Sequence, residues 1–266
     1  MTNRPRAKKH LGQNFLTSSA LITRMLEAYA LDENMTILEI GPGRGALTKH
    51  LIHSGAQVIA VEKDPDCVAV LQDAFSAAQN LTLIEHDFLS LDLDTLPAPD
   101  KIIGNIPYNI SSPIIEKLIR SRSLCSESFL TVQYEFARRL IAKPGTKDYS
   151  ALTCFLQYHA DIELLFKVPR TAFHPQPRVN SAFIHIRFRP PALAAHDERL
   201  LFRLTRTAFQ QRRKKIANAL EQLFPKEESH ELLEMCRLPA GLRPDQISLD
   251  DYVRMTNARC DQIKNR

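Results

Sequence analysis

The sequence predicts an α/β protein with a doubly wound, mostly parallel sheet, followed by a small all-helical domain. Short apolar runs alternate with amphipathic helical segments from about residue 36 onward, which is typical of parallel strands joined by crossover helices. Beyond the dipeptide Pro190-Pro191 the pattern becomes helical throughout, and paired prolines favour a break between domains. We therefore expect an α/β domain at residues 1–195 and a helical domain at residues 196–266.

Each expected strand is a short apolar run, and each expected helix has an apolar face at helical spacing. The parallel strands are expected at residues 36–40, 58–62, 81–86, 101–105 and 129–133, with helices at 46–53, 65–77 and 113–119 between them. Residues 163–168 and 181–188 are expected to close the sheet edge as an antiparallel hairpin, because apolar and polar side chains alternate in the second run. In the second domain, helices are expected at 198–223, 230–236 and 249–261.

The composition excludes several classes of protein. No apolar run reaches the roughly 18 residues needed to cross a bilayer, and the N-terminus lacks the apolar core of a secretory signal. The five cysteines are an odd number and include no C-x-x-C pair, which argues against a disulfide framework and against a zinc site. We expect a cytoplasmic monomer with reduced thiols, no metal centre and no membrane partner.

The net charge of +5 is unevenly distributed along the chain. Two segments are rich in lysine and arginine and contain no acidic residue, residues 1–24 and 199–220. Such clusters predict a polyanionic partner such as RNA, and a solvated basic face is the alternative. The residues expected to contact RNA are Lys8, Lys9, Arg206, Arg212, Arg213, Lys214 and Lys215.

Three successive strand ends carry residues suited to bind a nucleotide-like cofactor. The first runs into a loop with Gly41, Gly43 and Gly45, where the missing Cβ atoms let the backbone approach a ligand closely. This G-x-G-x-G spacing differs from the G-x-G-x-x-G of dinucleotide-binding proteins. Glu62 ends the second strand, where an acid accepts hydrogen bonds from ribose hydroxyls, and Asp87 ends the third, where it suits an adenine amino group. A tight turn and surface acids are the alternative.

The fourth strand ends in the tetrapeptide Asn105-Ile106-Pro107-Tyr108. An exocyclic nucleobase amine is a poor nucleophile, so an enzyme that methylates it must mainly orient it. The side-chain carbonyl of Asn105 and the backbone carbonyl of Ile106 offer two acceptors for its N–H groups. Pro107 fixes the backbone, and the Tyr108 ring suits stacking on an extruded base. A simple strand-ending turn is the alternative.

These motifs resemble those of class I methyltransferases, which have a Rossmann-like sheet and use S-adenosylmethionine. The glycine loop with its leading Glu matches their E-x-G-x-G-x-G pattern, and the tetrapeptide matches the [N/D/S]-[I/L/P]-P-[Y/F/W] signature of amino-methyltransferases. The resemblance implies cofactor contacts by Gly41, Gly43, Gly45, Glu62, Asp87 and Asn105. Phe183 resembles the aromatic residue that helps hold the target base in these enzymes, and a core phenylalanine is the alternative.

Further segments resemble the ribosomal RNA small-subunit adenine dimethyltransferase family. They are residues 8–16 (K-K-H-L-G-Q-N-F-L), 133–139, 173–181, 209–214 and 243–244. The resemblance extends from about residue 8 to residue 252. It implies that Asn14 and Leu16 lie over the cofactor, with Gln13 near them. It also implies N6,N6-dimethylation of two adjacent adenosines in a hairpin near the 3′ end of small-subunit rRNA, within the immature subunit, during ribosome biogenesis.

Two other functions remain open at this point. A DNA adenine N6-methyltransferase fits the tetrapeptide but does not explain the N-terminal motif or the helical domain. A non-catalytic ribosome-assembly or transcription factor on a methyltransferase scaffold is disfavoured by the intact glycine loop and by Glu62, Asp87 and Asn105.

Overall fold

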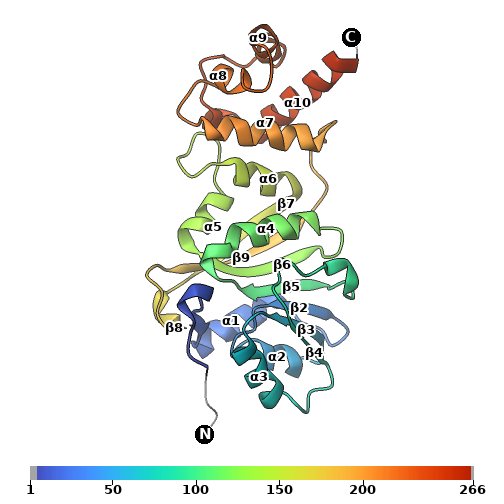
Figure 1. The fold of residues 1–266 in the computed structure, drawn as a ribbon, viewed down its shortest axis with the longest axis vertical. Helices are drawn as coiled ribbons and strands as arrows, with labels where there is room; N and C mark the ends of the chain where they lie inside the picture. The colour runs from blue at the N-terminus through green and yellow to red at the C-terminus, as the bar shows by residue number, and fades with distance from the viewer. Residues whose placement is uncertain (1–4, 265–266) are drawn as a thin grey trace. The chain divides into compact units, whose positions relative to one another are not determined.

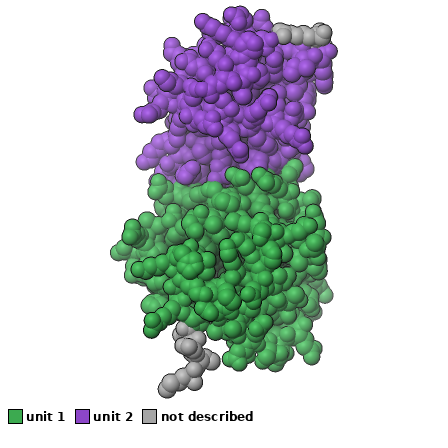
Figure 2. Space-filling view, in the orientation of Figure 1, with its two compact units in different colours: residues 1–137, 161–188 green, residues 138–160, 189–266 purple. Residues whose placement is uncertain are grey.

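The computed structural model describes residues 5–264, which form two compact units (Figures 1 and 2). The α/β unit contains the residues through 137 together with 161–188, and the helical unit contains 138–160 and the residues from 189 onward. The sequence predicts one boundary between the domains, near residue 195. Residues 138–160 nevertheless belong to the helical unit, which the sequence did not predict. Residues 1–4 and 265–266, at the ends of the expected basic cluster and helical domain, lie outside the described residues.

The central sheet confirms the predicted fold class. It has seven strands in the order β4-β3-β2-β5-β6-β9-β7, of which the first five are parallel and β9 pairs antiparallel with β6. The strands are β2 (Thr36–Ile40), β3 (Gln57–Glu62), β4 (Leu81–Glu85), β5 (Lys101–Asn105), β6 (Glu127–Gln133), β7 (Ala160–Val168) and β9 (Ser181–Phe188). The strand order reverses between β2 and β5, which is the position where ligands bind in doubly wound sheets.

The sheet is accompanied by α1 (Ser19–Tyr29), α2 (Thr48–His53), α3 (Pro65–Ala74), α4 (Ser111–Arg120) and α5 (Tyr134–Leu140), as Figure 1 shows. The periodicity predicted α2, α3 and α4 but not α1. Helix α1 buries Met25 and Tyr29 in a core that also contains Ile37, Phe129 and Phe183. Its apolar stripe therefore completes the core on one face of the sheet.

Two short strands join distant parts of the α/β unit. β1 (Phe15–Leu16) pairs antiparallel with β8 (Phe173–His174), with Leu16 opposite Phe173. This two-stranded ribbon fixes the N-terminal segment and was not predicted, because neither run is long enough to show a period. Short 3-10 helices complete the chain: η1 (Lys9–Leu11), η2 (Leu93–Thr95), η3 (Tyr108–Ile110), η4 (Arg170–Ala172) and η5 (Pro244–Gln246).

The helical unit consists of α6 (Ala151–His159), α7 (Glu198–Gln210), α8 (Ile216–Leu220), α9 (Lys226–Met235) and α10 (Leu249–Lys264). The single helix expected at residues 198–223 is wrong, because residues 211–215 form a turn between α7 and α8. Lys215 is extended, and the N–H of Ile216 donates to the carbonyl of Leu242 at 2.7 Å.

The core of this unit explains why residues 138–160 belong to it. Tyr149, Cys154 and Tyr158 share one buried cluster with Leu201 and Leu204 of α7. Helix α6 thus buries its apolar face among the C-terminal helices, although it lies between strands in the sequence. None of the helices within residues 5–264 is long and apolar enough to cross a membrane.

Candidate functional site

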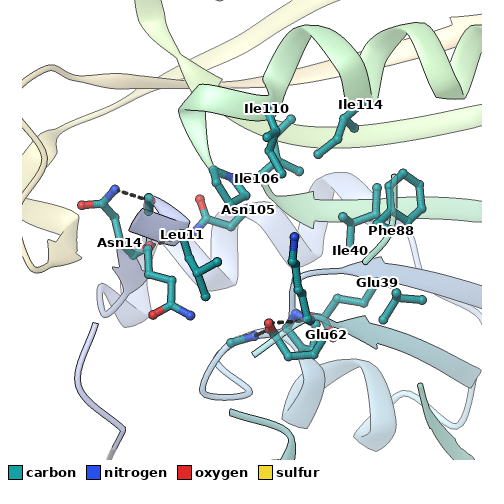
Figure 3. Close-up of a pocket in the computed structure, with 18 of the residues that line it drawn as sticks. Leu11, Asn14, Glu39, Ile40, Glu62, Phe88, Asn105, Ile106, Ile110 and Ile114 are labelled. Carbon is teal, nitrogen blue, oxygen red and sulfur yellow. Dashed lines mark hydrogen bonds between the residues drawn. The ribbon is translucent and has the colours of Figure 1, made fainter. Parts of the chain in front are cut away.

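A pocket opens at the carboxyl ends of β2, β3, β4 and β5 (Figure 3). It is lined by residues of the N-terminal segment, the glycine loop, the ends of β3 and β4, and the segment after β5. The lining residues labelled in Figure 3 include Leu11, Asn14, Glu39, Glu62, Phe88, Asn105 and Ile106. These segments are far apart in the chain and meet at the strand-order reversal. The pocket is therefore where a doubly wound sheet binds its ligand.

The glycine loop after β2 has three residues in the left-handed region, Gly41, Gly43 and Gly45, with φ of 62°, 58° and 78°. An added Cβ at Gly43 would lie 3.0 Å from the ring of Phe15, and one at Gly45 would lie 2.7 Å from the ring of Phe75. At Gly41 a Cβ would meet nothing within 4 Å. All three glycines are needed for the turn, but Gly41 alone faces open space in which a ligand can approach.

Glu62 holds the glycine loop and the start of the β3–α3 loop together. One carboxylate oxygen accepts the N–H of Gly43, and the other accepts those of Lys63 and Asp64, each at 2.9 Å. Burial raises the pKa of Glu62, and the three backbone hydrogen bonds oppose that shift. A carboxylate has about four acceptor positions, so about one remains for a ligand hydroxyl.

Glu39 also lines the pocket, although no role for it was predicted from the sequence. Its side chain is only 2% exposed, and its Oε2 makes no hydrogen bond to any described residue. Burial raises the pKa of Glu39 to about 7; the nearby Thr48 hydroxyl opposes this shift, and the charge of Glu62 adds to it. A buried carboxyl without a full set of partners calls for an explanation. The sequence signal was an acid inside an otherwise apolar strand.

Asp87 lies on the same rim of the pocket, after β4. One of its oxygens accepts from the Lys63 ammonium at 2.7 Å, and the other accepts from the N–H of Leu89 at 2.9 Å. Burial alone would raise its pKa, but these two hydrogen bonds lower it below the ordinary value. The neighbouring Phe88 is buried and its ring borders the pocket.

The orientation of Asn105 is set by the N-terminal segment. Its side-chain Nδ2 donates to the backbone carbonyl of Asn14 at 3.0 Å. Because a carbonyl can only accept, the NH₂ group must lie on that side. The Oδ1 atom of Asn105 is therefore the end of the amide left to accept a hydrogen bond from a ligand.

The rest of the tetrapeptide is fixed by contacts to the sheet. Ile106 is 1% exposed, and its N–H donates to the carbonyl of Thr131 at 3.3 Å. The Tyr108 hydroxyl lies 2.6 Å from the Oγ of Ser181 at the start of β9, and burial raises the pKa of Tyr108. Tyr108 and Pro107 both line the pocket.

Phe183 does not lie at the pocket. It is fully buried and packs against the rings of Tyr29, Phe129 and Phe166, with centroid distances of 5.7, 6.0 and 5.0 Å. Its position on β9 turns its side chain toward the core that α1 covers. The structure therefore gives Phe183 the alternative role, a core phenylalanine.

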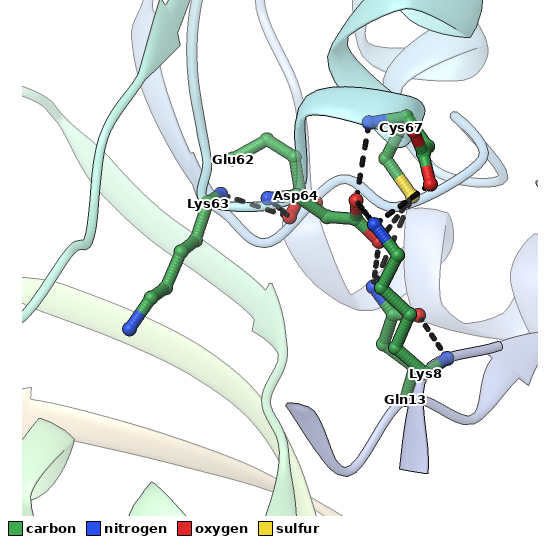
Figure 4. Close-up of polar contacts among 7 residues, drawn as sticks. Lys8, Gln13, Glu62, Lys63, Asp64 and Cys67 are labelled. Carbon is green, nitrogen blue, oxygen red and sulfur yellow. Dashed lines mark hydrogen bonds and ion pairs between the residues drawn. The ribbon is translucent and has the colours of Figure 1, made fainter. Parts of the chain in front are cut away.

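The N-terminal segment, residues 8–16, borders the pocket through Gln13, Asn14 and Leu16 among others. Gln13 does not point its amide into the pocket. Its Nε2 donates to Asp64 at 2.7 Å, and its Oε1 accepts the backbone N–H of Lys8 at 2.8 Å (Figure 4).

The basic residues expected to contact RNA fall into two groups. The side chains of Lys9, Arg206, Arg213, Lys214 and Lys215 are exposed. The other two are engaged within their own units. Lys8 pairs with Asp64 and Asp66 at 2.5 and 2.7 Å. Arg212 pairs with Asp245 at 3.2 Å and donates to the carbonyl of Thr146 at 3.0 Å.

Within residues 5–264 no group of three or more histidine, cysteine or acidic side chains is arranged to hold a metal ion. The pocket presents hydrogen-bonding groups and charges: backbone N–H groups at the glycine loop, the carboxyl groups of Glu39, Glu62 and Asp87, and an oriented amide.

Solved structures similar to this chain include the following two. A dimethyladenosine transferase from Plasmodium falciparum has a TM-score of 0.82 at 24% identity, covering 93% of this chain and 98% of its own, which shows a shared fold. The 23S rRNA methyltransferase ErmE has a TM-score of 0.71 at 28% identity, covering 94% of this chain and all of its own (100%).

Sequence relatives match over nearly the whole chain. The Ribosomal RNA small subunit methyltransferase A of Pseudomonas fluorescens Pf-5 is 40% identical over 97% of this chain and 96% of its own. The protein of the same name from Alcanivorax borkumensis is 41% identical over 95% of this chain and 90% of its own. A family model, Ribosomal RNA adenine dimethylase, matches residues 4–259. The chain therefore belongs to the ribosomal RNA adenine dimethylase family.

Proposed function

We propose that this chain uses S-adenosylmethionine to dimethylate N6 of two adjacent adenosines in a hairpin near the 3′ end of small-subunit rRNA, during subunit assembly. The observation that carries the proposal is the oriented amide of Asn105, whose Oδ1 is left for a donor at the edge of a nucleotide-type pocket. Family membership and the names of the relatives support the substrate class.

The residues of the pocket suit the proposed cofactor. Gly41 gives the backbone access to it, and Glu62 keeps about one acceptor position for a ribose hydroxyl. Asp87 would accept a hydrogen bond from the adenine amine, either while it keeps its hydrogen bond from the Lys63 ammonium or after that bond breaks. The unpartnered Oε2 of Glu39 is a buried acceptor beside the glycine loop, and a cationic ligand would stabilise its charged form. When bound, the cofactor supplies a reactive sulfonium methyl group.

The tetrapeptide would prepare the acceptor nitrogen. The Oδ1 of Asn105 and the carbonyl of Ile106 accept the two N–H groups of the target amine, which favours a pyramidal nitrogen with an available lone pair. The ring of Tyr108, held by Ser181, stacks on the extruded base. After the first transfer only one N–H remains, so the two acceptors cannot both keep their hydrogen bonds. This scheme uses no strong general base.

The exposed cations would hold the RNA backbone. A hairpin loop presents unstacked bases, which suits an enzyme that extracts one. In the helical unit the proposed phosphate contacts are Arg206, Arg213, Lys214 and Lys215, and in the α/β unit Lys9. The proposal includes a monomeric enzyme that acts in the cytoplasm, where small subunits assemble.

The test is a methyl-transfer assay with four acceptors: immature small subunits, free small-subunit rRNA, large-subunit rRNA and duplex DNA. The large-subunit arm is included because ErmE is named as a 23S rRNA methyltransferase. Nucleoside mass mapping should find N6,N6-dimethyladenosine at two adjacent positions in the small-subunit RNA. Methylation of DNA or of large-subunit rRNA alone would contradict the proposal. RNA binding without transfer would favour a non-catalytic assembly factor.

A further inference from the structure

The carboxylate of Asp64 lies beneath the N-terminal segment and is fully buried. Its Oδ1 accepts from the Lys8 ammonium at 2.5 Å and from the N–H of Asp66 at 3.1 Å. Its Oδ2 accepts from Gln13 Nε2 at 2.7 Å (Figure 4). We call the trio Lys8, Gln13 and Asp64 the clasp. A buried carboxylate is costly unless it is paired, so these contacts hold the segment strongly.

The clasp closes the segment on itself. The Oε1 of Gln13 accepts the backbone N–H of Lys8 at 2.8 Å, so residues 8–13 are fixed at both ends, with η1 between them. The backbone of Asp64 is also held in place, because its N–H donates a hydrogen bond to the Glu62 carboxylate at 2.9 Å. The clasp thus joins the segment to the loop that carries the proposed ribose acceptor.

From the clasp the segment reaches the tetrapeptide within two residues. Gly12 has a φ of 67°, and a Cβ there would lie 2.7 Å from Asn109 Oδ1 and 3.4 Å from Pro107 Cβ. Asn14 follows, and its carbonyl accepts from Asn105 Nδ2 at 3.0 Å. Gln13, a member of the clasp, is directly followed in the chain by Asn14, whose carbonyl orients Asn105.

We infer that the clasp is a positioning device for Asn105. Asp64, through Lys8 and Gln13, holds the N-terminal segment where the Asn14 carbonyl captures the amide NH₂ of Asn105 and leaves Oδ1 for the target amine. Lys8 acts on this segment and not on an RNA phosphate. The inference rests on the proposed role of Asn105. Loss of the clasp would let the amide rotate, which misplaces the acceptor without removing any group that touches the substrate.

The test compares three purified full-length variants. Lys8→Met removes the ammonium and keeps most of the apolar stem, Lys8→Arg restores the charge, and Lys9→Met removes the same charge from the exposed neighbour. For each we would measure the single-turnover rate at saturating cofactor and RNA, the Kd for S-adenosylhomocysteine, the Kd for RNA and the unfolding midpoint. Hydrogen exchange would report on the amides of residues 9–16.

Lys8→Met should lower the single-turnover rate about tenfold, since small misplacements of a reacting group cost this much or more. Exchange at residues 9–16 should accelerate, whereas RNA affinity should stay within about twofold of the parent, the scatter of such comparisons. Lys8→Arg should recover most of the rate. Lys9→Met should weaken RNA binding and leave the exchange of the segment unchanged.

Two outcomes would overturn the inference. One is that Lys8→Met and Lys9→Met weaken RNA binding equally while the rate at saturating RNA and the exchange stay at parental values. The other is a Lys8→Met rate loss accompanied by global unfolding and no selective exchange in residues 9–16, which would make the clasp merely structural. If the parent protein transfers no methyl group to rRNA, the proposed function fails, and the exchange data still decide whether Lys8 holds the segment.

Discussion

The floor and the roof of the pocket are held in different ways. The floor consists of the loops after β2, β3 and β5, whose strands are neighbours in a continuous parallel ladder. The roof is the N-terminal segment, held by a two-residue β-pairing and by the clasp. Segments with few backbone ladder bonds open at lower free energy than sheet cores. The site therefore combines a rigid base with a cover whose position depends on a few side chains.

The largest expected effect is at Asn105, where floor and roof meet. Asn105→Ala removes the oriented acceptor and should lower both methylations about 1,000-fold, by analogy with removal of one pre-organised polar group from an active site. Cofactor affinity should change much less. Measurements of dimethyladenosine by nucleoside mass analysis and of cofactor Kd by calorimetry check this. Normal dimethyl product from the variant would discard the role proposed for this residue.

The next effect concerns Glu39, a buried acid in strand β2 just before the first loop of the floor. Its pKa of about 7 lies above the ordinary 4.5 of the unfolded chain, so its contribution to stability is present below pH 4.5 and is lost as pH rises to about 7. Glu39→Gln imitates the protonated form. The variant should gain stability relative to the parent between pH 5 and 8, by up to about 3 kcal/mol.

Urea unfolding of the parent and the Glu39→Gln variant at pH 5 and at pH 8 gives the free energy of unfolding of each protein at each pH. Glu116→Gln on the exposed side of α4 serves as the control and should show little pH-dependent gain. A constant difference between the Glu39 variant and the parent would show that the carboxyl is already ionised at pH 5.

A matched pair of glycines separates backbone strain from contact with the roof. Gly41 and Gly43 have similar φ, 62° and 58°, so an alanine at either should cost about 1–2 kcal/mol in left-handed strain. Only the Cβ at Gly43 meets Phe15 of the roof, which should add about 1 kcal/mol of overpacking. Denaturant unfolding gives both values. Equal destabilisation would mean that the Phe15 ring moves away without cost.

The smallest effect is expected in the helical unit. There Arg212 is paired with Asp245, whereas the side chain of its neighbour Arg213 is exposed. Arg213→Ala should lower the slope of log Kd for RNA against log salt by about one unit, as expected for one lost phosphate contact. Arg212→Ala should leave the slope unchanged and reduce stability, because Arg212 is tied to Asp245 and Thr146. If both variants had the same slope of log Kd against log salt, the proposed difference between Arg212 and Arg213 in RNA binding would be wrong.

The sequence predicted the floor well because its signals are local. A strand followed by Gly41, Gly43 and Gly45, or by Asn105-Ile106-Pro107-Tyr108, is visible within a short window, and parallel strands bring such ends to one edge. The expected strands and the helices α2, α3 and α4 were found for the same reason. The family resemblance further indicated Gln13, Asn14 and Leu16 as residues near the cofactor, and all three border the pocket.

What the sequence could not show depends on long-range packing. The β1–β8 pairing joins residues about 160 apart, and the assignment of α6 to the helical unit follows from which surface buries it. Phe183 carries no local sign of whether its strand position faces the core or the pocket. Lys8 and Arg212 look like their basic neighbours, and only folding reveals the acids beside them.

The covered pocket has a consequence for repeated turnover. Each S-adenosylmethionine carries one transferable methyl group, so dimethylation of a single adenosine consumes two cofactor molecules in succession. The spent one must leave, and a fresh one must enter, a pocket that residues 10–16 border. If the RNA stays in place between the two transfers and the exchange requires residues 8–16 to move, the rate at which the Lys8–Asp64 ion pair opens sets an upper limit on how quickly a monomethylated base is completed. Monomethyladenosine would then accumulate under conditions that keep this pair closed and disappear when it exchanges rapidly.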